Sequence, residues 1–377
     1  MKPLTLPTHL HFMDPLRFIE TMILKTKGQK CALFLSESAA KRYHFEPMIE
    51  RLSKTSQLTW IKTSYSTPDY HDLASTLRSL KGLEFDVFIA IGGGSCLDLA
   101  KSTAAFIDFS KDDVSDEDLL KIIKDKTYLS QTTRPQLIAV PTTAGSGSEL
   151  TRWAILWDFD HEEKLSIETP HLAFDEAYIV VEFTLSMPLK LTLSTGLDAL
   201  TQASEAYWAK STTPSVQVLA LQAIRLIVRN LPRVLADPYD YEFRKNMMIG
   251  SILGAMAFSN TKTTACHSIS YPLTLKFKMD HGLACALTLG DILRHNLSAL
   301  SNPESVYEAF NINNPEQVTQ WIEKLSEGIV SMRLSDYGVK ESDLETLAHL
   351  SFTLGRMENN PIDLNEQQVQ DILKLHL

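Results

Sequence analysis

The segment DVFIAIGGGSCLDLAK, residues 86–101, decides the fold. Its first six residues are almost wholly apolar and predict a buried strand, whereas residues 95–106 have the spacing of a surface helix. The glycines between them let the backbone approach a phosphate, and the start of the helix offers N–H donors and a positive dipole end. This strand–glycine–helix unit therefore predicts a binding site for a diphosphate, although a tight turn without a ligand can have the same sequence.

The same alternation extends in both directions from this segment. Further short apolar runs predict strands, and amphipathic stretches between them predict helices. The expected strands are residues 31–36, 57–62, 136–140 and 177–181, and the expected helices of this half are residues 39–52 and 69–80. Strands and helices that alternate in this way predict a mainly parallel sheet with helices on both faces.

The pattern changes near Pro188. From Thr192 onward the periodicity is helical without a convincing strand, and residues 214–230, 239–258 and 263–271 have the length or composition of helices. We therefore expect an α/β dinucleotide-binding domain over residues 1–188 and an all-α metal-binding and substrate domain over residues 189–377.

Composition excludes several classes of protein. The 377 residues carry a formal net charge of -10, which argues against a nucleic-acid partner. No apolar run approaches the roughly 20 residues that span a bilayer, and Met1–Leu10 lacks the layout of a signal peptide. Because the four cysteines are scattered without C-x-x-C spacing, we read them as reduced thiols of a cytoplasmic protein with no membrane partner.

A second polar loop follows the strand predicted at residues 136–140. It reads PTTAGSGSE, residues 141–149, and supplies hydroxyl groups and glycines at the carboxyl end of a strand. Open α/β sheets bind ligands at that edge. Two such loops favour a nucleotide site over two turns without ligands.

The helical half contains a candidate metal site. Asp198 and Gln202 are four residues apart and so share one helix face, and His267 and His281 lie further along the chain. A carboxylate and two imidazoles from different helices can hold a divalent metal with an open position. A single histidine in a helix is more often a packed residue, so the spacing alone leaves both interpretations open.

Four segments in this order resemble the iron-containing, group III alcohol dehydrogenase family. They are GGGSCLDLAK (92–101), PTTAGSGSELT (141–151), STGLDALTQASEAYW (194–208) and HSISYPLTLKFKMDHGLACAL (267–287). The resemblance implies a dehydroquinate synthase-like architecture, a homodimer, and alcohol–aldehyde interconversion with a nicotinamide cofactor and a divalent metal, iron or zinc. It places the metal ligands at Asp198, position 202, His267 and His281.

The chain departs from the family at two positions of that site. Gln202 stands where the family has a ligand histidine, and Tyr271 stands where a second histidine usually follows the first of the pair. A glutamine carbonyl is neutral and binds iron or zinc more weakly than imidazole. The site is therefore expected to hold metal more loosely, to prefer another metal, or to use a water in the fourth position.

The cofactor positions match the family more closely. The resemblance assigns the phosphate loop, a pair of threonines and a lysine shortly after paired strands, and we count Asp98 with them. These residues are Gly93, Gly94, Ser95, Asp98, Thr142, Thr143 and Lys164. Glu37, after the first predicted strand, would repel a 2′-phosphate and so favours NAD, whereas a Glu37 that points to solvent would leave NADP open.

Three flanking segments resemble the phosphonoacetaldehyde reductase branch of this family. They are residues 151–158, 257–274 and 355–373. Arg152 and Lys262 suit the oxygens of a phosphonate, although each can also be an ordinary surface cation. Tyr271 or a chain of waters is the expected proton donor, although Tyr271 can equally be a packed aromatic residue.

Other functions remain open at this point. The same fold serves dehydrogenases of other small alcohols, aldehydes or diols, such as lactaldehyde and butanol. A lyase related to dehydroquinate synthase is disfavoured by the TTAGSGSE and GLDAL segments. A nucleotide-binding relative without catalysis is disfavoured because Asp198, His267 and His281 are all present.

Overall fold

The computed structural model describes residues 4–63, 67–111, 114–131 and 133–377. They form two compact units. The first, called here the sheet unit, consists of described residues within 6–143 and 148–186. The second, called here the helical unit, consists of residues 187–377 and 144–147 together with Leu4 and Thr5.

The sheet unit is built on six parallel strands in the order β1-β8-β5-β4-β2-β3. These strands are β1 (His9–Phe12), β2 (Lys30–Phe34), β3 (Gln57–Ile61), β4 (Val87–Gly92), β5 (Gln136–Pro141) and β8 (Glu176–Ile179). A separate antiparallel pair consists of β6 (Trp153–Asp158) and β7 (Glu163–Glu168). The predicted parallel sheet is confirmed, and β1, β6 and β7 are additional strands.

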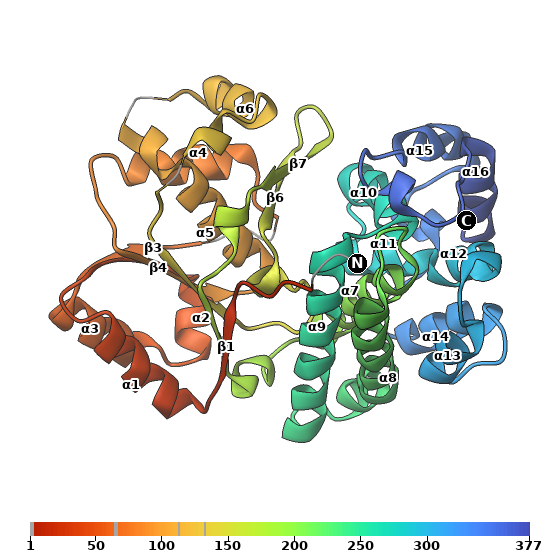
Figure 1. Ribbon diagram of the computed structural model, residues 1–377, viewed down its shortest axis with the longest axis horizontal. Helices are drawn as coiled ribbons and strands as arrows, with labels where there is room; N and C mark the ends of the chain where they lie inside the picture. Colours follow the sequence, from red (N-terminus) through yellow and green to blue (C-terminus); the bar gives the residue numbers. More distant parts are fainter. Residues whose placement is uncertain (1–3, 64–66, 112–113, 132) are drawn as a thin grey trace. The chain divides into compact units, whose positions relative to one another are not determined.

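Helices cover the sheet as Figure 1 shows. Helices α1 (Pro15–Lys25), α2 (Glu37–Arg42) and α3 (Glu46–Thr55) share one apolar core with alternate strand residues such as Leu33, Ile89 and Val140. A second core joins the β6–β7 pair to α4 (Tyr70–Ser79), α5 (Gly94–Phe106) and α6 (Asp116–Lys124). The strands are apolar on both faces because both faces are covered.

One predicted helix of this unit is two helices. The stretch expected at residues 39–52 divides into α2 and α3, and His44 between them has a φ of 54°. That left-handed value ends a right-handed helix. Pro47 then lies in the first turn of α3, where its missing N–H costs nothing.

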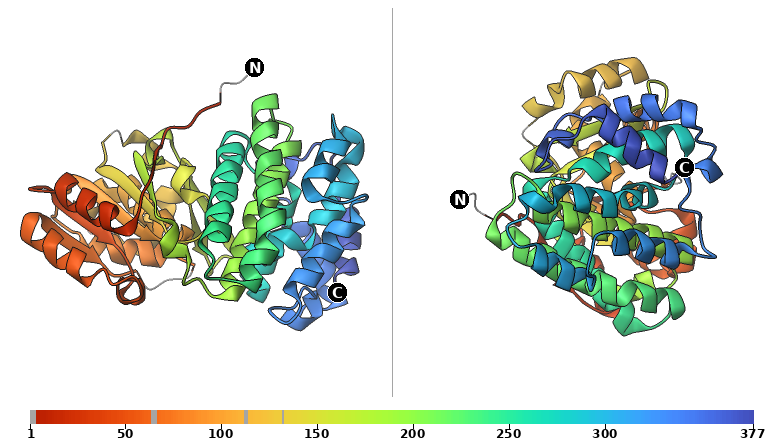
Figure 2. Two further views of the ribbon diagram at one scale, coloured as in Figure 1. Left: turned by 90° about the horizontal axis from the view of Figure 1, so that it is seen from below. Right: turned by 90° about the vertical axis from the view of Figure 1, so that its right-hand side faces the viewer.

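The helical unit contains only helices among its described residues, as predicted. They are α7 (Leu189–Trp208), α8 (Pro214–Ala236), α9 (Tyr241–Thr261), α10 (Ala265–Phe277), α11 (His281–Leu287), α12 (Leu289–Asn296), α13 (Pro303–Phe310), α14 (Glu316–Ser326), α15 (Leu344–Leu350) and α16 (Glu366–Leu375). Helices α7, α8 and α9 lie side by side (Figure 2), and α10 and α11 pack on α7. Within the part of the chain that the structure describes, no helix is both long and apolar enough to span a bilayer.

Candidate active site

The glycine loop lies where the strand order of the sheet reverses. The chain runs from β2 outward to β3 and then returns to β4, which pairs with the other side of β2. Open α/β sheets bind ligands at such a point, beyond the carboxyl ends of the strands. Gly92 ends β4, and Gly93 is the N-cap of α5 and has no side chain to cover the first amides of that helix. These residues can therefore hold an anion at the start of α5.

The Thr142–Thr143 pair lies beside this loop. Strand β5 pairs with β4, and the Thr142 amide donates to the Gly92 carbonyl over 2.9 Å. A Cβ on Gly93 would lie 3.3 Å from Cγ2 of Thr143, so the two loops are in close contact. The structure thus brings together Gly93, Thr142 and Thr143, which the sequence assigned to one cofactor.

Asp98 is engaged within the protein. Its carboxylate accepts from the Ser148 hydroxyl at 2.5 Å and from the Ile155 amide at 3.1 Å, and it lies 3.2 Å from the Lys101 ammonium. Lys101 is fully buried and donates to the carbonyl of Ser148 and the hydroxyl of Thr151, both at 3.0 Å. These contacts fix α5 against the segment that follows Thr143, so Asp98 holds the glycine loop in place and is not itself free for a ligand.

Two other predicted cofactor residues lie on the surface of the sheet unit. Glu37 is the first residue of α2, after β2, and its carboxylate is 2.6 Å from the Lys62 ammonium. The hydrogen bond from Lys62 lowers the pKa of Glu37. A cation beside Glu37 reduces its repulsion of a 2′-phosphate, which weakens the argument for NAD over NADP. Lys164 is half-buried and lies within β7, opposite Trp157 of β6, and not after the paired strands as expected.

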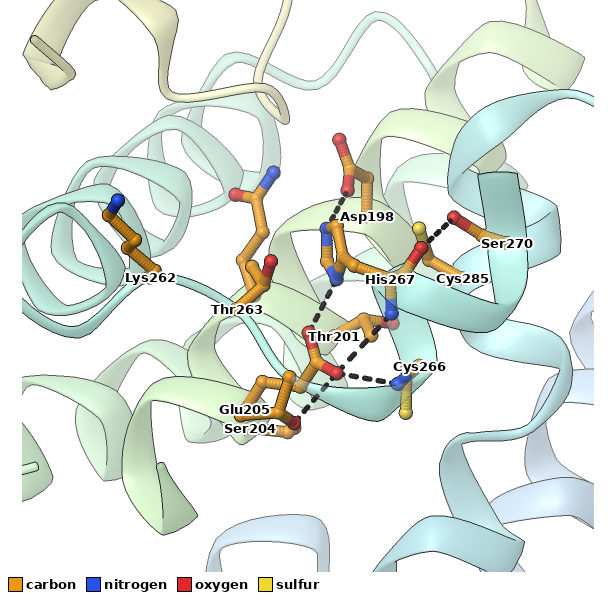
Figure 3. Close-up of polar contacts among 12 residues, drawn as sticks. Asp198, Thr201, Ser204, Glu205, Lys262, Thr263, Cys266, His267, Ser270 and Cys285 are labelled. Carbon is orange, nitrogen blue, oxygen red and sulfur yellow. Dashed lines mark hydrogen bonds and ion pairs between the residues drawn. The ribbon is translucent and has the colours of Figure 1, made fainter. Parts of the chain in front are cut away.

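The helical unit brings four potential metal donors together. They are Asp198 on α7, His267 on α10, and His281 and Cys285 on α11, and one donor atom from each lies within 4.8 Å of all the others. Nε2 of His267 is 3.3 Å from Oδ1 of Asp198, and Sγ of Cys285 is 3.6 Å from Nε2 of His281. Figure 3 shows Asp198, His267 and Cys285 converging from their three helices. This cluster is the candidate metal centre.

Glu205 orients His267 within this cluster. Its Oε2 lies 2.5 Å from Nδ1 of His267, so the ring presents Nε2 to Asp198 (Figure 3). Its other oxygen accepts from the amides of Cys266 and His267 and from the Thr264 hydroxyl. Burial alone would raise the pKa of Glu205, but the charge and hydrogen bond of His267 lower it. Ionised Glu205 is the partner that metal-binding histidines commonly have behind them.

Neighbouring groups of the cluster change each other's pKa values. Burial would raise the pKa of the Cys285 thiol, but His267 and His281 outweigh burial and bring it to about 7. Burial would lower the pKa of His267, but the charges of Cys285 and Glu205 raise it well above its usual value. A thiol and a carboxylate facing two imidazoles form a donor set suited to a divalent cation.

Gln202 lies one turn after Asp198 on α7, and its side chain is buried. Its amide nitrogen is 3.4 Å from the Ser146 carbonyl, and its Oε1 has no hydrogen-bond partner among the described residues. The structure thus leaves Gln202 as a second oxygen donor near Asp198.

The three residues predicted to act on the substrate, Tyr271, Lys262 and Arg152, lie in different surroundings. The Tyr271 ring stacks on the His281 ring at 6.0 Å and 10°, so this tyrosine at least holds a candidate ligand in place. Lys262 follows α9 with φ 66° and ψ 176°, a conformation that almost only glycine adopts. Arg152 belongs to the sheet unit, is half exposed, and lies 3.7 Å from Glu168.

Two residues of the cluster and its surroundings, Cys285 and Glu205, were not predicted from the sequence. Cys285 is four residues after His281, which is the spacing of two ligands on one helix face. No sequence signal distinguishes Glu205 from a surface glutamate, because its role depends on the start of α10 packing against α7.

Comparisons with known proteins agree on one family. Residues 11–179 match the family model described as iron-containing alcohol dehydrogenase, and residues 192–377 match the C-terminal model of the same family. A phosphonoacetaldehyde reductase of Streptomyces viridochromogenes is 31% identical over 324 residues, which cover 82% of this chain and 80% of the relative. A 1,3-propanediol dehydrogenase of Klebsiella pneumoniae is 31% identical, with 77% and 75% covered. The structure of a Bifidobacterium kashiwanohense sulfoacetaldehyde reductase in complex with NAD+ has the same fold, with a TM-score of 0.86 at 23% identity and 100% and 98% of the chains covered.

Proposed function

Because this chain belongs to the iron-containing alcohol dehydrogenase family, an NAD(P)-dependent oxidoreductase family, we propose that it reduces a small anionic aldehyde, with phosphonoacetaldehyde as the favoured substrate and 2-hydroxyethylphosphonate as the product. The sheet unit and the helical unit are proposed as its cofactor domain and its metal and substrate domain. A cytoplasmic homodimer remains the expected state of the protein, and sedimentation of the purified protein tests the dimer.

The donor cluster fits a divalent metal. Asp198, His267 and His281 are buried or half-buried and point their donor atoms at one another. Buried charged groups of this kind are costly unless they are paired or bind a metal. A metal bound here supplies Lewis acidity to the carbonyl of the substrate, and the nicotinamide supplies the hydride.

The protein's own residues keep the centre in order. Glu205 holds Nδ1 of His267, and the Ser270 hydroxyl, which donates to the His267 carbonyl at 2.7 Å, lies 3.4 Å from Nδ1 of His281. Each imidazole is thus held from behind and keeps Nε2 for the cluster. Tyr271, stacked on His281, is the proposed source of the proton for the alkoxide product.

The proposal of an anionic substrate rests on Lys262. A non-glycine residue in its backbone conformation is strained and persists only where its surroundings hold it. The Asn359 side chain does so by donating to the carbonyls of Thr261 and Thr263 at 2.9 and 3.1 Å, on either side of Lys262. Such strain next to the residues that lead into His267 supports a functional role for the lysine, and an ammonium group there suits a phosphonate. Arg152 stays a prediction from the sequence, since it lies in the sheet unit as a half-exposed cation 3.7 Å from Glu168.

The test compares phosphonoacetaldehyde with a neutral aldehyde of similar size. NADH and NADPH oxidation are measured for the wild-type protein, Lys262→Met and Lys262→Gly, with the exposed Lys324→Met as the matched control. Loss of one charge-assisted contact should raise KM for the phosphonate about tenfold to a hundredfold in both Lys262 variants and leave the neutral aldehyde unchanged.

The outcomes separate the candidate functions. Lys262→Gly relieves the backbone strain, so it shows whether a defect in Lys262→Met is one of folding rather than of charge. Turnover of neutral aldehydes or diols alone would keep the dehydrogenase and overturn the phosphonate assignment. Absence of turnover with either cofactor would overturn the proposal as a whole.

A further inference from the structure

We propose that the Cys285 thiolate is a metal ligand of this enzyme, in place of the side chain at position 202, and that this sulfur directs the site to zinc rather than iron. The inference rests on the proposed function only in that a divalent metal occupies the cluster.

Two distances in the cluster can be compared with those between the ligands of a tetrahedral zinc ion. Zn–N and Zn–O bonds of about 2.0–2.1 Å and a Zn–S bond of about 2.3 Å separate tetrahedral ligands by about 3.3 Å for N and O pairs and about 3.6 Å for N and S pairs. His267 Nε2 and Asp198 Oδ1 are 3.3 Å apart, and His281 Nε2 and Cys285 Sγ are 3.6 Å apart. Both pairs thus have the separation of two ligands to one ion. Because Sγ of Cys285 is also 3.8 Å from Nδ1 of His281, the imidazole must turn to aim Nε2 at an ion bound to the sulfur.

The helix geometry makes His281 and Cys285 act together. They are one turn apart on α11, and Cys285 is completely buried. Gly282, between them, lets the start of α11 approach α7 so closely that a Cβ would lie 2.0 Å from the Ser194 carbonyl oxygen and 3.0 Å from Cβ of Asp198. This contact brings both α11 donors to the Asp198 carboxylate.

Cys266 provides an internal comparison. It is also buried and is adjacent to His267 in the chain, but it is absent from the donor cluster, and its sulfur points away from Asp198 in Figure 3. Burial next to a ligand therefore does not by itself bring a sulfur into the site, and Cys285 enters it because of its position on α11.

The rival donor is the Gln202 carbonyl. It is neutral and hard, whereas a thiolate is charged and soft. A site of one carboxylate, two imidazoles and one thiolate combines the ligand types that zinc accepts, while iron is better served when oxygen and nitrogen replace the sulfur. With all four bound, the substrate carbonyl would have to enter as a fifth ligand, a coordination number that zinc can adopt. The choice between Gln202 and Cys285 therefore also decides which metal is preferred.

The first experiment uses cobalt as a spectroscopic probe. The full-length apoprotein is loaded with Co²⁺, and the near-ultraviolet sulfur-to-cobalt charge-transfer band is recorded for the wild type, Cys285→Ser, Gln202→Ala and Cys266→Ser. The band should be present in the wild type, absent in Cys285→Ser, and retained in both Gln202→Ala and the control Cys266→Ser. A wild-type protein without the band overturns the proposal, whether or not any variant folds.

The second experiment measures metal choice. Apoprotein is equilibrated anaerobically with equal amounts of Zn²⁺ and Fe²⁺, and the bound metals are quantified. The zinc-to-iron ratio should fall at least tenfold in Cys285→Ser and stay unchanged in Cys266→Ser, and an unchanged ratio in Cys285→Ser overturns the role of the sulfur. These readouts do not need substrate. A charge-transfer band without turnover would therefore contradict the proposed function alone, and turnover without the band would contradict this inference alone.

Discussion

At the scale of single residues, the candidate metal centre depends on a carboxylate that does not face the metal. Glu205 is fully buried, and its two oxygens accept hydrogen bonds from one ring nitrogen, two backbone amides and one hydroxyl. It therefore fixes both the tautomer of His267 and the start of α10. A buried carboxylate with so many donors is costly to alter, and its charge strengthens the imidazole as a ligand.

We expect Glu205→Gln to weaken metal binding by about tenfold to a hundredfold while the protein remains folded. Glutamine keeps the shape of the side chain, but it lacks the negative charge and places an amide nitrogen against donors. Competition with a chromophoric chelator measures the affinity, and Glu345→Gln, at an exposed position of α15, is the matched control. Equal affinities in the two variants would show that Glu205 has only a packing role.

The sequence could predict some of these residues and not others. Asp198, His267 and His281 stand in motifs whose types and spacing already point to a metal, and the structure places their donor atoms together. Cys285 was not predicted as a ligand, because a spacing of four residues from His281 is shared by any two residues that pack on one helix face. The role of Glu205 arises from contacts between residues about 60 positions apart, such as the 62 that separate it from His267, and no local pattern encodes them.

At the scale of elements, the centre depends on how closely α11 approaches α7. We expect Gly282→Ala to cost about 1–3 kcal/mol of stability and to abolish high-affinity metal binding, because the added methyl group would overlap the Ser194 carbonyl and push His281 away from Asp198. Denaturant unfolding and metal titration measure the two effects.

Gly254→Ala is the matched control for that variant. Gly254 lies inside α9, where an added Cβ would meet its nearest neighbours at 3.4 and 3.5 Å, which is ordinary contact. Alanine also favours a helix interior, so this variant should keep its metal and its stability. Loss of metal in both variants would mean that any glycine change in these helices disturbs the centre.

Two of the three strands that were not predicted, β1 and β7, have weak sequence patterns, whereas the third, β6 (WAILWD), is an apolar run that is typical of a strand. Strand β1 (HLHF) lies at an edge of the sheet and is only partly buried, so it lacks the continuous apolar run of the central strands. Strand β7 alternates polar and apolar residues, as an antiparallel pair with one covered face does. The break between α2 and α3 depends on the backbone of His44, which periodicity does not report.

At the scale of the whole molecule, the loop after β5 belongs to both units. Thr142 and Thr143 are part of the sheet unit, whereas residues 144–147 are part of the helical unit. Two glycines let this segment pack closely on the helical unit. A Cβ on Gly145 would lie 2.4 Å from Cβ of Thr195 on α7, and a Cβ on Gly147 would lie 2.5 Å from Cβ of Ala255 on α9. A boundary drawn at residue 188 from periodicity alone cannot include such an excursion, because the segment looks like a single polar loop.

Two units with separate ligand sites should respond separately to their ligands. We expect NAD to slow amide hydrogen exchange around Gly93 and Thr142, and zinc to slow it in α7, α10 and α11, because each ligand stabilises the unit that binds it. Removal of zinc by a chelator should reverse the second effect and leave the first. Residues 144–147 are the informative segment, since they pack on α7 and α9 but are joined directly to Thr143. If zinc slows exchange in residues 144–147 and NAD does not, their packing on α7 and α9 determines their stability more than their connection to Thr143 does. If the chelator exposes both units equally, the units unfold as one and their separate assignment is wrong.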